Sequence, residues 1–261
     1  MHVQSAADLL AAHRLEQKAF PGFPANLQPA DEGEAYAVQD ALHELLALAD
    51  GRSVAGHKIG CTTPVMQRYM AIPSPCAGGV FENTVHHGDA VLVHEDYVRV
   101  GVECELAVRL SVDLLADNGP FELSGVRDTI AAVMPAIEIV EDRYEDFSSL
   151  PTPTLIADDF FGAGCILGRE TTDWGDLHLS SVSAQMLIDG SEVGSGTGSD
   201  ILGDPLNALL WLANSRAARS RSLLAGDIVL LGSLVQTHWV ERGQTVVVDN
   251  AALGTVTVRF R

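Results

Sequence analysis

Few features of this sequence are those of a membrane, secreted or nucleic-acid-binding protein. No uninterrupted apolar run approaches the roughly 18 residues that a membrane-spanning helix needs. The start, Met-His-Val-Gln-Ser-Ala-Ala-Asp, lacks the basic and then apolar pattern of a signal peptide. We therefore expect a soluble, cytoplasmic protein.

Basic residues are also scarce. The chain carries 16 Lys and Arg against 35 Asp and Glu, which gives a formal net charge of −19. Because phosphate backbones are bound by basic surfaces, this balance argues against nucleic acid as a partner. It does not exclude a small anionic substrate, since a metal ion and one lysine can reverse the field locally.

Cysteine is rare, and its spacing suggests neither a disulfide framework nor a CxxC motif. Four residues lie far apart in the sequence and are expected to be reduced thiols: Cys61, Cys76, Cys104 and Cys165. Internal repeats, low-complexity tracts and charge blocks do not occur. With 261 residues, 47% of them hydrophobic, the chain is long enough for one large domain with a substantial core.

Two kinds of apolar pattern divide the chain. Residues 5–20 and 34–49 have helical spacing and flank a proline-rich linker, whereas short β-rich runs separated by Gly, Pro and Asp follow from residue 54. Helical patterns return at 124–134 and at 204–216, where Asp204-Pro205 is a good N-cap and first-turn pair. We predict a single α+β domain over residues 1–261, with a helical N-terminal flank (1–50) and a β-rich core (51–261) built on a curled mixed sheet. The expected strands are 54–59, 90–94, 98–110, 136–140, 165–168, 182–188, 227–231 and 253–260.

The most informative segment is Glu103-Cys104-Glu105, within the strand-like run 98–110. Side chains at i and i+2 of a strand leave the same face, so these two carboxylates can point to one place. Glu138 is another lone acid in an apolar, β-branched run. Carboxylates on a buried face are costly unless a positive group neutralises them. The alternative is that the alternation only places both glutamates on a solvated sheet face.

A hard divalent cation with oxygen ligands would neutralise these acids. The candidate ligands are all carboxylates, and no His or Cys lies at a chelating spacing beside them. This donor set favours Mg²⁺ or Mn²⁺ over Zn²⁺.

Compared as a set, five segments resemble the fumarylacetoacetate hydrolase superfamily, specifically its branch of 2-keto-4-pentenoate hydratases and 4-oxalocrotonate decarboxylases. They run in the order of the family across most of the chain: Gly56–Thr62, Val102–Ala107, Pro135–Val140 with Arg143, Leu202–Ala208 with Trp211–Asn214, and Gly226–Ser233.

The resemblance implies a mixed β-roll that forms homodimers or larger assemblies. It implies a metal site of Glu103, Glu105 and Glu138, and a catalytic, substrate-contacting Lys58. Two further residues are expected to contact the substrate, Arg143 and Ser233, and Asp142 with Arg143 is expected to orient the metal carboxylates. The substrates of the family are small 2-keto or 2-hydroxydienoic acids from the meta-cleavage route of aromatic breakdown.

The implied reaction is hydration. A divalent ion on the 2-oxygen favours the enolate, so the dienol can take up a proton at C5 and water can add at C4. Loss of carbon dioxide from a 4-oxalocrotonate-type substrate reaches the same enolate, which leaves a decarboxylase open. An acylpyruvate C–C hydrolase is less favoured because Thr62–Met70 contains neither His nor an acid. A non-catalytic, metal-binding scaffold subunit is the alternative from another class.

Several positions differ from the pattern of the family. Cys76–Gly79 stand where an acid and an aromatic residue are frequent, Asp158-Asp159 where Asp-Asn is usual, Asp204 where His is usual, and Val235 where Thr is common. Asp159 and His238 are the acid and base candidates, because either could relay a proton to or from the dienolate. Each also has a structural interpretation, as a turn residue and as a histidine at a strand end.

Overall fold

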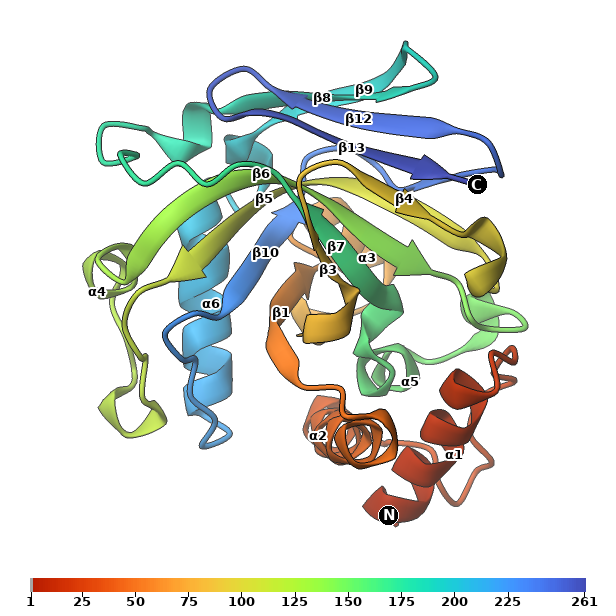
Figure 1. Cartoon of the computed structure of the whole chain (residues 1–261). Coiled ribbons are helices and arrows are strands. Elements are labelled where there is room, and N and C mark those ends of the chain that lie inside the picture. The colour runs from red at the N-terminus through yellow and green to blue at the C-terminus, as the bar shows by residue number, and fades with distance from the viewer. Residues whose placement is uncertain (1) are drawn as a thin grey trace.

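The computed structural model describes residues 2–261 and consists of two β-sheets flanked by helices (Figure 1). None of the helices within these residues is long and apolar enough to cross a membrane. The α-helices are α1 (Val3–Leu15), α2 (Glu32–Asp50), α3 (Pro64–Tyr69), α4 (Leu123–Arg127), α5 (Thr152–Ala157) and α6 (Pro205–Ala217).

The larger sheet contains eight strands in the order β2-β1-β10-β5-β6-β7-β3, with the short β11 paired to β5. Most of its pairs are antiparallel, but β1 with β10 and β3 with β7 are parallel. The strands β2 and β7 lie close together although four strands separate them in the sheet, so the sheet curls on itself. This confirms the predicted α+β class with a curled mixed sheet. Its strands are β1 (Val54–Gly60), β2 (Cys76–Phe81), β3 (Val85–His87), β5 (Val100–Leu110), β6 (Ile130–Glu141), β7 (Gly162–Leu167), β10 (Ile228–Ser233) and β11 (His238–Trp239).

The smaller sheet has five strands in the order β4-β13-β12-β8-β9. It forms the upper layer in Figure 1, where β13 lies against β6 and β7 of the larger sheet. Its strands are β4 (Ala90–Leu92), β8 (Ser183–Ile188), β9 (Ser191–Thr197), β12 (Thr245–Asn250) and β13 (Gly254–Phe260).

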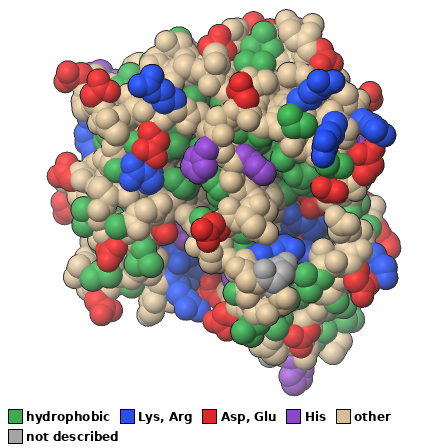
Figure 2. Space-filling model, in the orientation of Figure 1, with side chains coloured by type: hydrophobic (Ala, Val, Ile, Leu, Met, Phe, Trp, Pro, Cys, Tyr) green, Lys and Arg blue, Asp and Glu red, His purple; other side chains and the backbone are tan. Residues whose placement is uncertain are grey.

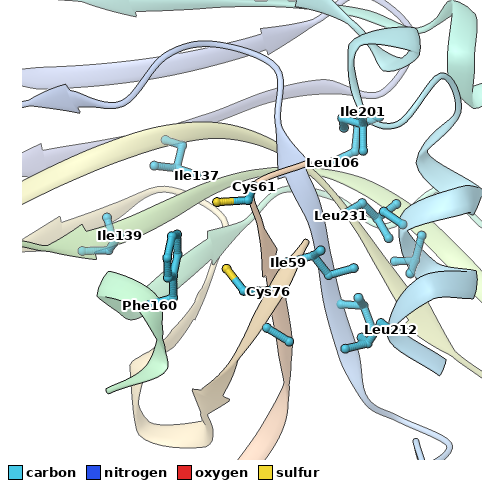
Figure 3. Packing of buried hydrophobic residues seen from close by; sticks show 14 of the residues in the cluster. Ile59, Cys61, Cys76, Leu106, Ile137, Ile139, Phe160, Ile201, Leu212 and Leu231 are labelled. Carbon is cyan, nitrogen blue, oxygen red and sulfur yellow. The ribbon is translucent and has the colours of Figure 1, made fainter. Parts of the chain in front are cut away.

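The central strands β5 and β6 are covered on both faces. Leu106 and Ile137 belong to the main hydrophobic core, part of which Figure 3 shows. Ala107 and Met134, on the other face, belong to a second and smaller apolar cluster inside the curl. Side chains of β5 and β6 on this inner face are therefore withdrawn from water, whatever their polarity.

The N-terminal helices pack against each other, and α2 packs against α5. The Asp31 side chain caps α2 by accepting from the Glu34 N–H, and Gly51 ends the helix in the left-handed conformation. In α6, Asp204 accepts from the Leu206 N–H, which confirms the predicted cap.

The helix predicted over 124–134 is wrong for most of its length. Helix α4 ends at Arg127, and β6 begins at Ile130 and pairs with β5 along its whole length. A run of small and apolar residues fits a helix as well as a strand that is buried on both faces, and here the pairing with β5 decides. Five strands were not predicted: β2, β3, β9, β11 and β12. Of these, β3 and β11 are short and β2 and β9 contain glycine, whereas β12 has neither feature.

On the face shown in Figure 2, basic side chains stand singly or in small groups among acidic ones. This face offers no broad basic surface to a phosphate backbone, in agreement with the net charge.

Candidate active site and metal centre

Three glutamates converge inside the curled sheet. Glu103 and Glu105 leave the same face of β5, and Glu103 lies directly opposite Glu138 in the β5–β6 ladder. One carboxylate oxygen from each lies within 4.8 Å of one from each of the others. The structure thus brings together the two glutamates of the alternation and Glu138, the three residues expected to hold a metal.

Burial makes this cluster electrostatically unfavourable without a cation. Glu105 is 0% exposed and Glu138 is 1% exposed. Burial, with Glu138 and Glu103 next, raises the pKa of Glu105 well above its ordinary value. Burial also raises the pKa of Glu138 to about 7, although the neighbouring Lys58 lowers it. The solvated-face alternative, which concerned Glu103 and Glu105, is therefore wrong for Glu105, while Glu103 is half-buried.

The residues present fit a hard divalent cation. Glu105 Oε1 is buried without a hydrogen-bond donor, and Glu138 Oε1 has an ion pair with Lys58 but no hydrogen bond. An unpartnered buried carboxylate oxygen such as Glu105 Oε1 is costly unless a cation coordinates it. Three carboxylates at this spacing match the oxygen preference of Mg²⁺ and Mn²⁺.

Two donors orient these carboxylates. The Gly232 N–H donates to Glu105 Oε2 at 2.7 Å, and the Thr237 hydroxyl donates to Glu103 Oε1. Thr237 was missed in the sequence. No local pattern links it to Glu103, which lies 134 positions earlier.

Lys58, on β1, completes the cluster as a buried cation. Its Nζ lies 3.2 Å from Glu138 Oε1 as an ion pair, and only 3% of the residue is exposed. Burial opposes its charge, but Glu138 and Glu103 outweigh burial and raise the pKa of Lys58 above its ordinary value. Lys58 therefore stays an ammonium group at neutral pH.

Ser233 lies at the end of β10, opposite Glu105 in the ladder. Its hydroxyl donates to the Val235 carbonyl at 2.7 Å, a contact that shapes the segment leading to Thr237. The predicted Ser233 is thus beside the carboxylates, with its hydroxyl engaged by the backbone.

Arg143 and Asp142 lie beyond the end of β6, and their contacts lead away from the three glutamates. The Arg143 guanidinium donates to the Asp158 carboxylate at 3.1 Å and to the Gly162 carbonyl at 2.6 Å. Asp142 forms an ion pair with Arg99 at 3.3 Å. The structure therefore connects Arg143 to the turn before β7.

Asp159 is 0% exposed and points toward the N-terminal helices. Its Oδ1 lies 2.7 Å from His43 Nε2 and accepts from the Gly79 N–H at 2.8 Å, and its Oδ2 lies 2.9 Å from an Arg14 nitrogen. Burial opposes its ionisation, but His43 and Arg14 outweigh burial and lower the pKa of Asp159 below its ordinary value. Arg14 and His43 carry no sequence signal that links them to Asp159.

His238 is the second predicted acid–base residue. It pairs with Val102 in the β11–β5 ladder, and side chains of paired residues share one face of a sheet. Val102 faces the main core, opposite to Glu103. The register thus places Thr237 on the carboxylate face and His238 on the other.

A cavity of about 780 Å³ lies elsewhere, between the start of α2, the loop after α3 and the segment before α5. None of the three glutamates lines it, and its walls are mainly apolar, with Ile72, Phe147 and Leu150 among them. It brings together no set of chemically active side chains comparable to the carboxylate cluster.

Comparison with known proteins gives several matches over most of the chain. Residues 62–261 match the family model described as fumarylacetoacetate (FAA) hydrolase, C-terminal. The 2-keto-4-pentenoate hydratase 1 of Dechloromonas aromatica is 31% identical over 260 residues, which cover 100% of this chain and 97% of that protein. The TodF product hydratase of Pseudomonas putida is 33% identical over 258 residues, covering 99% and 95%. The 2-oxo-hept-4-ene-1,7-dioate hydratase of Escherichia coli is 31% identical over 232 residues, covering 87% and 86%.

Solved structures show the same fold. The 4-oxalocrotonate decarboxylase of Pseudomonas putida G7, complexed with magnesium and adipate, superposes with a TM-score of 0.92 at 24% identity over 99% of this chain and 97% of that one. A fumarylpyruvate hydrolase from Pseudomonas aeruginosa, in complex with Mn²⁺ and pyruvate, gives a TM-score of 0.60 at 15% identity over 80% and 88%.

Proposed function

Because the chain belongs to the fumarylacetoacetate hydrolase family, we propose that it is a metal-dependent hydratase of a small 2-hydroxy-2,4-dienoate. The observation that carries the proposal is the cluster of three carboxylates beside Lys58 within the curled sheet. Relatives that cover nearly the whole chain at 31% to 33% identity are named as hydratases. This supports hydration over the other reactions that such a site could accelerate.

Glu103, Glu105 and Glu138 would hold the metal, and Mg²⁺ and Mn²⁺ both fit the donor set. When bound, a divalent cation supplies a Lewis acid that stabilises negative charge on an enolate oxygen. The protein keeps its ligands aligned through the Gly232 N–H and the Thr237 hydroxyl. These donors fix two of the three carboxylates before any substrate arrives.

Lys58 provides the second positive charge. With all groups ionised, the cluster carries three negative charges against one positive charge, so it repels an anionic substrate until a divalent cation is present. The Lys58 ammonium then lies where it can bind the substrate carboxylate or the oxyanion that develops from it. Its burial strengthens that interaction because little water competes for the charge.

The other candidate residues take lesser roles in this proposal. For Ser233 we keep a substrate contact as part of the proposal, supported only by its position opposite Glu105 in the ladder. We assign no proton transfer to Asp159 or His238, since the first is held in ion pairs and the second belongs to the opposite sheet face.

The proposal is tested by following the loss of dienol absorbance of 2-hydroxypentadienoate and of oxalocrotonate, with chelator and with Mg²⁺ or Mn²⁺. Products are identified by mass. Metal-dependent gain of water is the expected result. Loss of carbon dioxide would establish the decarboxylase instead. An acylpyruvate is offered as a third substrate, and its cleavage would establish the hydrolase.

A matched variant separates catalysis from scaffolding. Glu105→Gln keeps an oxygen acceptor for the Gly232 N–H but removes one negative ligand. If the metal is catalytic, folded Glu105→Gln protein should lose turnover. If the protein is a scaffold subunit, wild type will be inactive with all three substrate types, and the variant will differ only in thermal stability.

Two further expectations complete the proposal, namely a cytoplasmic location and a homo-oligomeric assembly of two or more copies. Light scattering coupled to size-exclusion chromatography measures the assembly directly. A monomer at micromolar concentration would contradict it.

A further inference from the structure

The turn between α5 and β7 has an unusual backbone. Three successive residues, Asp159, Phe160 and Phe161, have φ values of 56°, 46° and 66°. Side chains with a Cβ avoid this left-handed region because the Cβ comes too close to the following carbonyl oxygen. A run of three, two of them aromatic, requires strong contacts elsewhere to hold it.

One set of contacts holds the carboxylate of Asp159. The Gly79 N–H of β2 and the His43 ring of α2 both lie within 2.8 Å of Oδ1. An Arg14 nitrogen of α1 lies 2.9 Å from Oδ2, as an ion pair rather than an aligned hydrogen bond. The first residue of the turn is therefore tied to three different elements.

A second set holds the two ends of the turn. Arg14 Nε donates to the Asp158 carboxylate at 2.6 Å, so the same guanidinium binds two consecutive acids. Arg143 donates to the other Asp158 oxygen and to the Gly162 carbonyl. The turn is thus bracketed by arginines on both sides, with the side chains of Arg14 and Arg143 each 8% exposed.

The turn delivers an aromatic ring to Lys58. Lys58 Nζ lies over the Phe160 ring, 5.1 Å from its centroid, and both residues are buried. The approach is close enough that a Cβ on Gly60 would stand 2.8 Å from the ring, and one on Gly78 would stand 2.5 Å from the Asp159 carbonyl oxygen. Figure 3 shows the Phe160 ring beside Cys61 and Cys76, at the ends of β1 and β2.

We propose that Arg14 and His43 are positioning residues that act on the active site through Phe160. They hold the left-handed turn, and the turn fixes the ring against which the Lys58 ammonium rests. Glu138 and Phe160 together then define where the charge of Lys58 stands. The two N-terminal helices contribute to the site in this way although they lie outside residues 62–261, which match the family model. The role in turnover rests on the proposed function, but the placement of Phe160 does not.

The sequence offers a probe of this placement that needs no substrate. Lys18 and Lys58 are the only lysines of the chain, and Lys18 is exposed at the surface. Selective [¹³C]lysine labelling therefore gives two ε-methylene signals by NMR, and the Lys18 signal serves as an internal reference. Phe160→Leu removes the ring current and shows which shift of the Lys58 signal depends on it.

Arg14→Gln should move the Lys58 signal toward its position in Phe160→Leu and leave the Lys18 signal in place. In the double variant Arg14→Gln/Phe160→Leu, the Lys58 signal should have the same position as in Phe160→Leu alone. Arg109→Gln is the matched control, because it breaks an arginine–carboxylate pair with Glu170 outside this network, and it should leave both signals unchanged. A Lys58 signal that moves in Phe160→Leu but not in Arg14→Gln would overturn the proposal. If Arg14→Gln does not fold, His43→Leu tests the same contact from α2.

Kinetics test the consequence for turnover. Arg14→Gln should lower kcat about 10-fold with little change in KM, and Arg14→Lys should recover part of the loss because it keeps a cation beside Asp159. The fold-losses in kcat of Arg14→Gln and Phe160→Leu should not multiply in the double variant, since both substitutions act through the Phe160 ring. Losses that multiply would show that Arg14 acts independently of Phe160. Inactive wild-type protein would refute the proposed function, while the lysine signals would still decide the placement.

Discussion

Removing divalent cations should destabilise this protein more strongly above neutral pH than below it. Burial raises the pKa of Glu138 from 4.5 to about 7. A carboxyl with a raised pKa in the folded state binds its proton more tightly there, so stability is lost as the pH rises between these two values. Once ionisation is complete, the cost is about 3 kcal/mol for Glu138. Glu105 adds to it, because burial and Glu138 raise its pKa in the same direction.

A bound cation reverses this dependence because only deprotonated carboxylates are good ligands. At a free metal concentration about 100 times Kd, binding stabilises the folded state by about 2.7 kcal/mol. For a chain of this length, that corresponds to a rise of roughly 5–10 °C in Tm. The rise should be small near pH 5, where protons compete with the metal, and full near pH 8.

Thermal unfolding followed by circular dichroism, at several pH values and constant ionic strength, measures both effects. The Tm in chelator should fall relative to the Tm in Mg²⁺ or Mn²⁺ as the pH rises. Glu105→Gln is the control, since it removes one buried charge and should reduce both the pH slope in chelator and the metal-induced rise. A difference in Tm between metal and chelator that stays constant from pH 5 to pH 8 would refute the reasoning.

Three further variants test individual contacts. Lys58→Met should lower kcat/KM at least 100-fold in dienoate turnover while keeping the metal-induced rise in Tm, because Lys58 is a counter-charge and not a ligand. Thr237→Val should weaken metal binding about 10-fold in a Mn²⁺ titration, through loss of the hydrogen bond to Glu103. Leu106→Ala should lower the free energy of unfolding by about 2–5 kcal/mol in urea, because Leu106 is 0% exposed; an intact metal-induced rise in Tm would show that the site survives.

The carboxylate cluster could be predicted because its signal is local. The alternation of Glu103 and Glu105 specifies a shared face as soon as the segment is a strand, and Glu138 stands out as an acid in an apolar run. A divalent cation follows from the chemistry of the donors. The helical flank, the α+β class and the cap at Asp204 were equally accessible, since each rests on short-range patterns.

The rest depended on long-range contacts. The start of β6 at Ile130 was missed because pairing with β5, and not local preference, decides its conformation. Asp159 was named as an acid–base candidate because it could relay a proton, and nothing in the sequence reveals its ion pair with Arg14, which lies 145 positions earlier. Thr237 and His238 lie on opposite faces of the sheet because of the way β11 pairs with β5, and this pairing cannot be read from the sequence.

The double contact of Arg14 also sets an order of events during synthesis. Arg14 and Asp158 are 144 residues apart, so at about 5–20 residues per second the ribosome needs roughly 7–30 s to deliver the acid after the arginine. Until then α1 and α2 can pack together, but the side chains of Arg14 and His43 lack their partners Asp158 and Asp159. The left-handed turn can therefore be fixed only after Asp158–Phe161 have been made, whereas β10, which lies between β1 and β5 in the larger sheet, is made later still.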